Sequence, residues 1–170
     1  EDHKDNIWMG ATGGAIWFDP DDEIPEFRFM PFPESGNEFM LWTLLEDSKR
    51  NMWFGTYQGG LYKYDGDKVI DYQKVLGLRS DAYLSLIEDS EGKIWIGTFN
   101  GVFRYDPNIP VSGNEPNIIH FGEAAGLSSD LVYLMAMDEQ EKYLWIGTNQ
   151  GLNKLKLEEF RKTGRKIIEH

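Results

Sequence analysis

A fourfold repeat constrains the fold of this chain of 170 residues more than any other feature. Each copy has a Trp, a Gly two residues later, and a second Gly six residues after the Trp. The repeated tryptophans are Trp8, Trp53, Trp95 and Trp145, and the second glycines are Gly14, Gly59, Gly101 and Gly151. Successive tryptophans are 45, 42 and 50 residues apart. Repeats of this length indicate a fold built from copies of one supersecondary unit.

Each copy predicts four short strands. An apolar inner strand precedes the Trp strand in three copies, and a third strand alternates aromatic with polar residues. The fourth strands are expected at 27–32, 68–72, 117–121 and 166–169. Four-stranded antiparallel units of this period are typical of β-propeller blades. We therefore expect an all-β fold, with residues 1–170 forming a single β-propeller segment of about four blades, at 1–36, 37–76, 77–125 and 126–170.

The strand count predicts a partial propeller. The first copy has only the polar residues 1–6 before its Trp strand and so lacks an inner strand. Fifteen strands, or three and three-quarter blades, follow from this count, and only 157–162 looks helical. Because an incomplete ring exposes sheet edges, we expect self-association. Tight closure as four blades is the alternative.

Composition narrows the choice of partners. The chain has 17 Lys and Arg against 29 Asp and Glu, for a net charge of −12. This charge argues against binding nucleic acid or docking directly on an anionic membrane. The absence of Cys excludes disulfides and thiolate metal sites. The first residue is Glu1 and no signal-peptide pattern follows, so we interpret the sequence as a mature or excised segment.

Three segments resemble the two-component regulator propeller repeat: 93–108 (KIWIGTFNGVFRYDPN), 51–66 and 143–155. The segment 126–148 is similar to the crossover and inner strand of that repeat. Departures are Ala11 in place of Thr, the additional Gly60, and the loss of aromatic residues from the third strand of the last copy. The resemblance implies the extracytoplasmic, periplasmic part of a bacterial inner-membrane sensor. By the same resemblance, the best-understood members of the family sense oligosaccharides, and a histidine kinase follows on the same chain.

Blade geometry predicts that the crossovers and the turns after the Trp strands share one face. Aromatic rings beside amides and carboxylates on that face suit a sugar or another small-molecule ligand. The alternative is that these polar groups only form hydrogen bonds with the turn backbone or face solvent. Trp42 is expected at the mouth of an inner strand, in contact with an axial channel. The candidate ligand-binding residues are Trp42, Tyr57, Gln58, Asp81, Tyr83, Phe99, Asn100, Asp130, Tyr133, Asn149 and Gln150.

Other repeated residues are better explained by structure. The four repeated tryptophans are expected to pack between adjacent blades. The acidic pairs 46–47, 88–89 and 138–139 recur with the predicted hairpins, which favours turn capping over calcium binding. The acidic segment 19–23 is expected to be a solvated loop. We expect no metal and no cofactor.

No catalytic motif appears in the sequence, and His120 falls in a predicted outer strand. The sequence therefore favours a non-enzymatic ligand-binding segment of a signalling receptor. One alternative is a truncated propeller enzyme, a lyase or glycan-active hydrolase, which a catalytic His or metal cluster at the channel mouth would support. The other is a protein-interaction scaffold. Binding of small sugars without partner proteins would favour a sensor over a scaffold.

Overall fold

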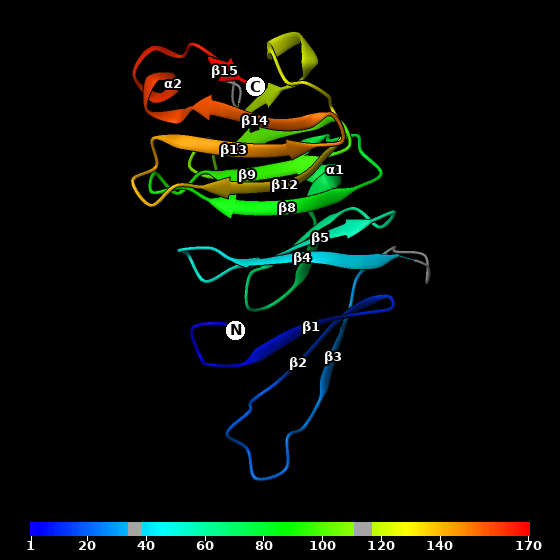
Figure 1. The fold of residues 1–170 in the computed structure, drawn as a ribbon. Coiled ribbons are helices and arrows are strands. Elements are labelled where there is room, and N and C mark those ends of the chain that lie inside the picture. The colour runs from blue at the N-terminus through cyan, green and yellow to red at the C-terminus, as the bar shows by residue number, and fades with distance from the viewer. Residues whose placement is uncertain (34–38, 111–116) are drawn as a thin grey trace.

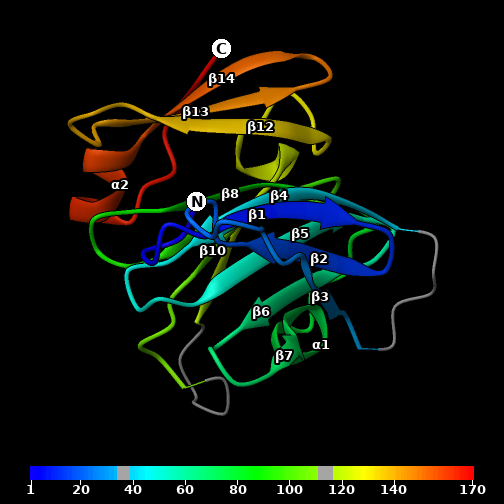
Figure 2. The same ribbon diagram turned by 90° about the horizontal axis from the view of Figure 1, so that it is seen from below.

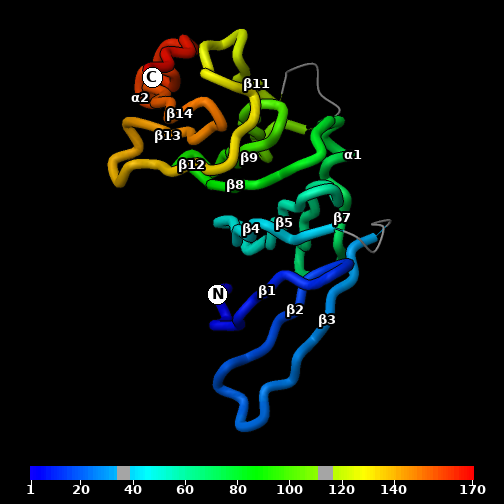
Figure 3. The backbone as a smooth tube through the Cα atoms, turned by 45° about the vertical axis from the view of Figure 1, so that its right-hand side comes forward, coloured from blue at the N-terminus to red at the C-terminus, as the bar shows by residue number. Residues whose placement is uncertain are grey.

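The computed structural model describes residues 1–33, 39–110 and 117–170, and these form four antiparallel sheets. Figures 1 and 3 show the sheets following one another in chain order from the N-terminus to the C-terminus. The first sheet is β1 (Ile7–Ala11), β2 (Gly14–Phe18) and β3 (Arg28–Pro31). It lacks an inner strand, as predicted from the polar residues before Trp8.

The other three sheets each contain four strands, and their strand order follows the chain. The second contains β4 (Met40–Glu46), β5 (Met52–Tyr57), β6 (Leu61–Tyr64) and β7 (Val69–Asp71). The third contains β8 (Tyr83–Glu88), β9 (Ile94–Thr98), β10 (Gly101–Tyr105) and β11 (Ile118–Phe121). The fourth contains β12 (Val132–Met137), β13 (Tyr143–Thr148), β14 (Gly151–Lys156) and β15 (Ile168–Glu169). The predicted all-β, partial-propeller fold is confirmed. The predicted blade boundary between residues 36 and 37 lies outside the described residues.

Short helices connect some of the strands. The predicted helical segment is confirmed as α2 (Leu157–Thr163), between β14 and β15. Figure 2 shows α2 at one end of the fourth sheet and the turn between β13 and β14 at the other. Two elements were not predicted: α1 (Tyr72–Leu76) and the 3-10 helix η1 (Glu123–Ala125). The Asp71 side chain caps α1 by accepting a hydrogen bond from the backbone N–H of Lys74.

The hydrophobic core lies between the sheets rather than within one layer. One cluster joins the first and second sheets through Phe32, Phe54 and Tyr62. A second joins the second and third sheets around Trp53, and a third joins the third and fourth sheets around Trp95. Burial of large aromatic rings at each junction supplies the main stabilisation, because apolar area removed from water dominates folding.

Three of the four repeated tryptophans pack between sheets as expected. Trp8 contacts Phe54 of the next sheet, and Trp53 and Trp95 are fully buried. The prediction is wrong for Trp145, which is 36 % exposed and makes its ring contacts within its own sheet. Trp145 differs because, among the described residues, no sheet packs against the face of the fourth sheet that carries it. The same face explains why the apolar inner strand β12 exposes Leu134.

The motif residues have separable structural roles. A Cβ on Gly55 would lie 2.5 Å from the carbonyl oxygen of Tyr83, so this Gly allows the next inner strand to approach closely. The Thr98 hydroxyl donates a hydrogen bond of 2.9 Å to the carbonyl of Gly101 and closes the turn. Gly101 has a φ of +81°, the left-handed conformation that glycine adopts at little cost. In the first two turns Gly13 and Gly60 take this conformation instead.

Candidate ligand face at the crossovers

The turns and crossovers lie on one face of the molecule, as predicted. Backbone hydrogen bonds tie the turns of the second and third sheets to the crossovers beside them, from Gln58 N to Asp81 O at 2.6 Å and from Gly101 N to Asp130 O at 2.8 Å. We call this surface the crossover face. The hairpins after the inner strands lie at the opposite end of the sheets, which we call the hairpin face (Figure 1).

Two adjoining clefts open on the crossover face. The first has a volume of about 460 Å³ and is lined by Gln58, Gln73, Ser80 and Asp81, among others. The second has a volume of about 410 Å³, shares Gln73, Ser80 and Asp81, and adds Phe99 and Asn100. Four predicted residues are thus brought together by loops from two blades. Their amide and carboxylate groups give the clefts hydrogen-bond donors and acceptors beside one aromatic ring.

A row of three aromatic rings crosses the crossover face. The rings of Tyr57 and Phe99 meet edge to face with centroids 6.2 Å apart. Phe99 meets Tyr133 in the same way at 5.4 Å. Each ring comes from a different blade, so the row spans three sheets. Apolar ring faces presented in this way suit stacking against flat apolar groups of a ligand.

A β-bulge recurs in each inner strand and sets the direction of two candidate side chains. The register between β4 and β5 skips Trp42, and the register between β12 and β13 skips Tyr133. The equivalent skipped residue in β8 is Leu84. Trp42 is 54 % exposed and Tyr133 is 45 % exposed. Because a bulge turns an extra residue out of the regular alternation, it accounts for large rings that remain accessible on inner strands.

The remaining predicted residues are spread more widely. Asp130 lines a third cleft of about 360 Å³ with His120 and Lys166, and its carboxylate accepts a hydrogen bond from the backbone N–H of Glu123. Asn149 and Gln150 are exposed in the turn of the fourth sheet.

Tyr83 differs from the prediction of an accessible ligand contact, because the structure buries it completely in the core. Burial raises the pKa of the Tyr83 hydroxyl well above its usual value. Tyr83 begins β8, where its side chain points to the core between the second and third sheets. The identity of the residue alone could not reveal that direction.

Sequence reasoning missed several residues that line these clefts: Gln73, Arg79, His120 and Lys166. His120 lies in an outer strand as predicted, yet its Nε2 is 2.8 Å from the carbonyl oxygen of Asn100. The aromatic stacking of His120 on Phe103 orients the imidazole toward that turn. The alternation of β10 and β11 would have placed these two rings on one sheet face, but it could not show that His120 reaches the crossover.

The described residues contain no group of three or more His, Asp or Glu side chains arranged to hold a metal ion. Within the same residues, neither the length nor the apolarity of any helix is sufficient to cross a membrane.

Sequence comparison identifies two of the repeats. The profile of the two component regulator propeller matches residues 34–58 and 77–100. Each match includes an inner strand, the Trp strand and the turn that follows. The matched segments therefore include Trp42, Tyr57 and Gln58 in one blade, and Asp81, Phe99 and Asn100 in the next. No curated protein shows significant similarity to the chain.

Solved structures share the fold. The extracellular domain of the one component system BT4673 from B. thetaiotaomicron is 20 % identical, with a TM-score of 0.75 over 99 % of this chain and 24 % of that chain. The extracellular domain of the hybrid two component system BT3049 from the same organism is 25 % identical, with a TM-score of 0.64 over 90 % of this chain and 20 % of that chain.

PorZ, a surface component of the type-IX secretion system of Porphyromonas gingivalis, is 17 % identical, with a TM-score of 0.60 over 91 % of this chain and 25 % of that chain. The chain thus spans a quarter or less of the length of these structures. It is a propeller segment related to the extracellular regions of two-component systems, and it carries repeats of the two component regulator propeller family.

Proposed function

We propose that this chain is a ligand-binding segment of the sensor region of a two-component receptor. The ligand is an oligosaccharide, and it binds across the crossover face. The observation that carries this proposal is the aromatic row of Tyr57, Phe99 and Tyr133, at centroid distances of 6.2 and 5.4 Å, beside two polar clefts. A sugar chain has apolar ring faces for the aromatic row and hydroxyls for the amides and carboxylates.

The chemistry of the clefts supports binding rather than catalysis. Gln58 and Asn100 offer amides, and Asp81 offers a carboxylate at an exposed position. Amides and carboxylates of this kind recognise hydroxyls through hydrogen bonds. In the proposal, ligand binding shifts the receptor between two arrangements, and the signal passes to segments beyond this chain.

The related extracellular domains support an extracytoplasmic, periplasmic location for the same role. In that compartment the crossover face meets oligosaccharides that have entered the cell envelope. The chain has a net charge of −12. Where no cation stands nearby, its surface therefore favours neutral ligands over strongly anionic ones.

A glycan array of neutral and acidic oligosaccharides, probed with the chain, tests the proposal. Any oligosaccharide that binds is then measured by titration calorimetry with Phe99→Ala and Tyr133→Ala. Each variant is expected to weaken binding about tenfold, since one stacked ring contributes roughly 1 kcal/mol or more. Tyr143→Ala is the matched control, because Tyr143 is an aromatic residue of the fourth sheet that begins β13 at the hairpin face. Absence of binding on the array, or equal loss in Tyr143→Ala, would contradict the proposal.

A further inference from the structure

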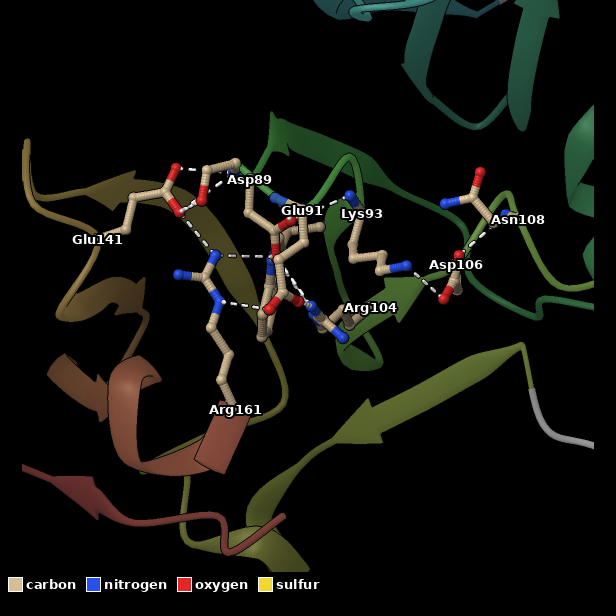
Figure 4. Close-up of polar contacts among 10 residues, drawn as sticks. Asp89, Glu91, Lys93, Arg104, Asp106, Asn108, Glu141 and Arg161 are labelled. Carbon is tan, nitrogen blue, oxygen red and sulfur yellow. Dashed lines mark hydrogen bonds and ion pairs between the residues drawn. The ribbon is translucent and has the colours of Figure 1, made fainter. Parts of the chain in front are cut away.

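The three junctions between sheets differ at the hairpin face in what covers them. At the junction of the third and fourth sheets, α2 covers the groove: Phe160 is buried there, and Arg161 reaches Asp89 and Glu141 at 3.3 and 2.6 Å (Figure 4). At the junction of the second and third sheets, Asn108 from the loop after β10 accepts a hydrogen bond of 2.9 Å from Lys49.

The junction of the first and second sheets has no such cover among the described residues. The equivalent connection, between β6 and β7, is a tight turn in which the Asp65 carboxylate accepts hydrogen bonds of 3.0 Å from the N–H groups of Asp67 and Lys68. A turn this short does not reach across the groove. A cleft of about 350 Å³ remains, and its lining includes Trp8, Trp17 and Tyr64.

Aromatic rings form the apolar wall of this cleft. Trp8 and Trp17 stack with centroids 5.6 Å apart and an interplanar angle of 24°, and the ring of Tyr64 lies 6.3 Å from Trp8. Trp17 stands at the position that Lys63 and Arg104 occupy in the next two sheets, opposite the repeated Trp. The first sheet therefore has a second Trp where its neighbours have a Lys or an Arg, and the cation over Trp17 is Arg28 from β3.

The three acidic groups that line the cleft, Asp2, Asp19 and Glu46, all accept hydrogen bonds within the chain. Asp19 accepts one of 2.9 Å from the backbone N–H of Asp21. Asp2 accepts hydrogen bonds from Trp8 Nε1 at 2.8 Å and from the backbone N–H of Asn6 at 3.0 Å. Burial opposes ionisation, but the hydrogen bonds from Trp8 and Asn6 hold the pKa of Asp2 below its usual value. Glu46 accepts from the backbone N–H of His3 at 2.8 Å and also contacts its imidazole.

The cations of the same cleft are not engaged in this way. The guanidinium of Arg28 lies over Trp17, 4.5 Å from the ring centroid, and its one ion pair is with the solvent-exposed Glu26 at 3.4 Å. Among the described residues, Lys4 and Arg50 form no ion pair and no side-chain hydrogen bond, and both line the cleft. The donors available to a ligand are therefore cationic, and they stand beside a flat aromatic wall.

From this arrangement we propose that the cleft between the first and second sheets binds a small carboxylate carried on a flat apolar ring. The ring packs against the aromatic wall of Trp8, Trp17 and Tyr64, and the carboxylate accepts hydrogen bonds from Arg28 and Arg50. Guanidinium groups suit this task because their fork of donors matches the two carboxylate oxygens. The site lies on the hairpin face and is independent of the oligosaccharide proposal, which concerns the opposite face.

Titration calorimetry with 2-naphthoate tests the proposal, and 2-naphthamide serves as the uncharged probe of the same shape. The chain is expected to bind 2-naphthoate and to bind the amide at least about tenfold more weakly. Arg28→Gln and Arg50→Gln are each expected to weaken 2-naphthoate about tenfold. Arg79→Gln is the matched control, since Arg79 is an exposed Arg on the crossover face.

The position of binding is read from the indole N–H signals of the six tryptophans by NMR. The Trp17 and Trp8 signals are expected to shift with 2-naphthoate, and those of Trp42 and Trp145 to stay. Equal affinity for the two probes, an equal loss in Arg79→Gln, shifts at Trp42 in place of Trp17, or no heat at millimolar 2-naphthoate would each overturn the proposal.

Discussion

The indole Nε1 of Trp95 donates a hydrogen bond of 2.9 Å to Oδ2 of Asp89, six residues earlier in the chain. The same bond joins Trp53 to Asp47 and Trp8 to Asp2, at 2.8 Å in both cases. In each case the other carboxylate oxygen accepts from backbone N–H groups of the turn before the Trp strand. One Asp therefore fixes the turn and also satisfies the buried indole, which accounts for the constant six-residue spacing.

The Asp89 carboxylate also forms ion pairs with residues outside its turn. Arg104 and Arg161 lie 3.1 and 3.3 Å from its Oδ2, and Glu91 and Glu141 complete the cluster (Figure 4). Asp89→Asn is expected to destabilise the fold by about 2–4 kcal/mol, because it leaves an indole and two guanidinium groups with a weaker partner. Urea unfolding followed by circular dichroism measures this loss.

Asp138→Asn is the control for that variant. Asp138 accepts a hydrogen bond of 2.6 Å from the backbone N–H of Tyr143, but it lies seven residues before Trp145 and, within the part of the chain that the structure describes, is not hydrogen-bonded to that indole. Its replacement is expected to cost about 1 kcal/mol or less. An equal loss of unfolding free energy in the two variants would show that the indole hydrogen bond and the two arginines do not stabilise the fold.

Lowering the pH is expected to remove the contribution of Asp89 to the free energy of unfolding. Burial opposes its ionisation, but the hydrogen bond from Trp95, the backbone of Lys93 and the charge of Arg104 hold its pKa below the usual value. A carboxyl with a lowered folded-state pKa stabilises the fold above its unfolded-state pKa of about 3.9, and this stabilisation is lost as pH falls through the folded-state value. The difference in unfolding free energy between the chain and Asp89→Asn is therefore expected to shrink as pH falls from about 5 toward 2. A difference that stays constant over this range would contradict a charged Asp89.

Much of the fold can be predicted from the sequence because each structural element occurs in several copies of the repeat. The Trp, the Gly two residues later and the acidic turn each recur with the same contacts, so period and alternation predict the strands. α1 escaped prediction because five residues after β7 are too few to show helical periodicity.

The candidate site was less predictable, since it depends on direction rather than on residue type. Trp42 and Tyr133 stay accessible because bulges turn them out of the strand alternation, whereas Tyr83 lies one residue before the same bulge and is buried. A bulge has no signal in a single sequence. The cleft beside Trp17 was also missed, because it results from a short turn in one blade where another blade has a helix.

Arg161 is expected to hold α2 against the third sheet. Its guanidinium lies 2.6 Å from Glu141 and 3.3 Å from Asp89, and most of its side chain is buried. Arg161→Gln is expected to destabilise the fold by about 1–3 kcal/mol, since it leaves buried carboxylates with less positive charge. Hydrogen exchange of the α2 amides is expected to rise with it.

The neighbouring Lys162→Gln serves as the control for α2. Lys162 pairs with Glu158 at 2.5 Å, but both side chains are largely exposed, and such pairs contribute little. It is expected to change stability by less than about 0.5 kcal/mol. If Lys162→Gln matches Arg161→Gln in both measurements, the buried cluster does not anchor α2.

Two open sheet faces predict self-association of the chain. On the fourth sheet, Leu134 and Leu152 both stand opposite Gly147 in the register and are exposed on the same face as Trp145. On the first sheet, Met9 and Phe29 share a face through Ile16, and both are exposed. Contiguous apolar surface of this kind favours packing against a second copy.

Light scattering over a dilution series is expected to give a mass that rises above 19.6 kDa with concentration. Leu134→Glu with Leu152→Glu is expected to lower that mass toward the monomer, because burying two carboxylates in the contact is costly. Ile24→Glu, at an exposed apolar residue of the loop between β2 and β3, is the control and is expected to leave the mass unchanged. A mass of 19.6 kDa at every concentration would show that the open faces do not pair between chains.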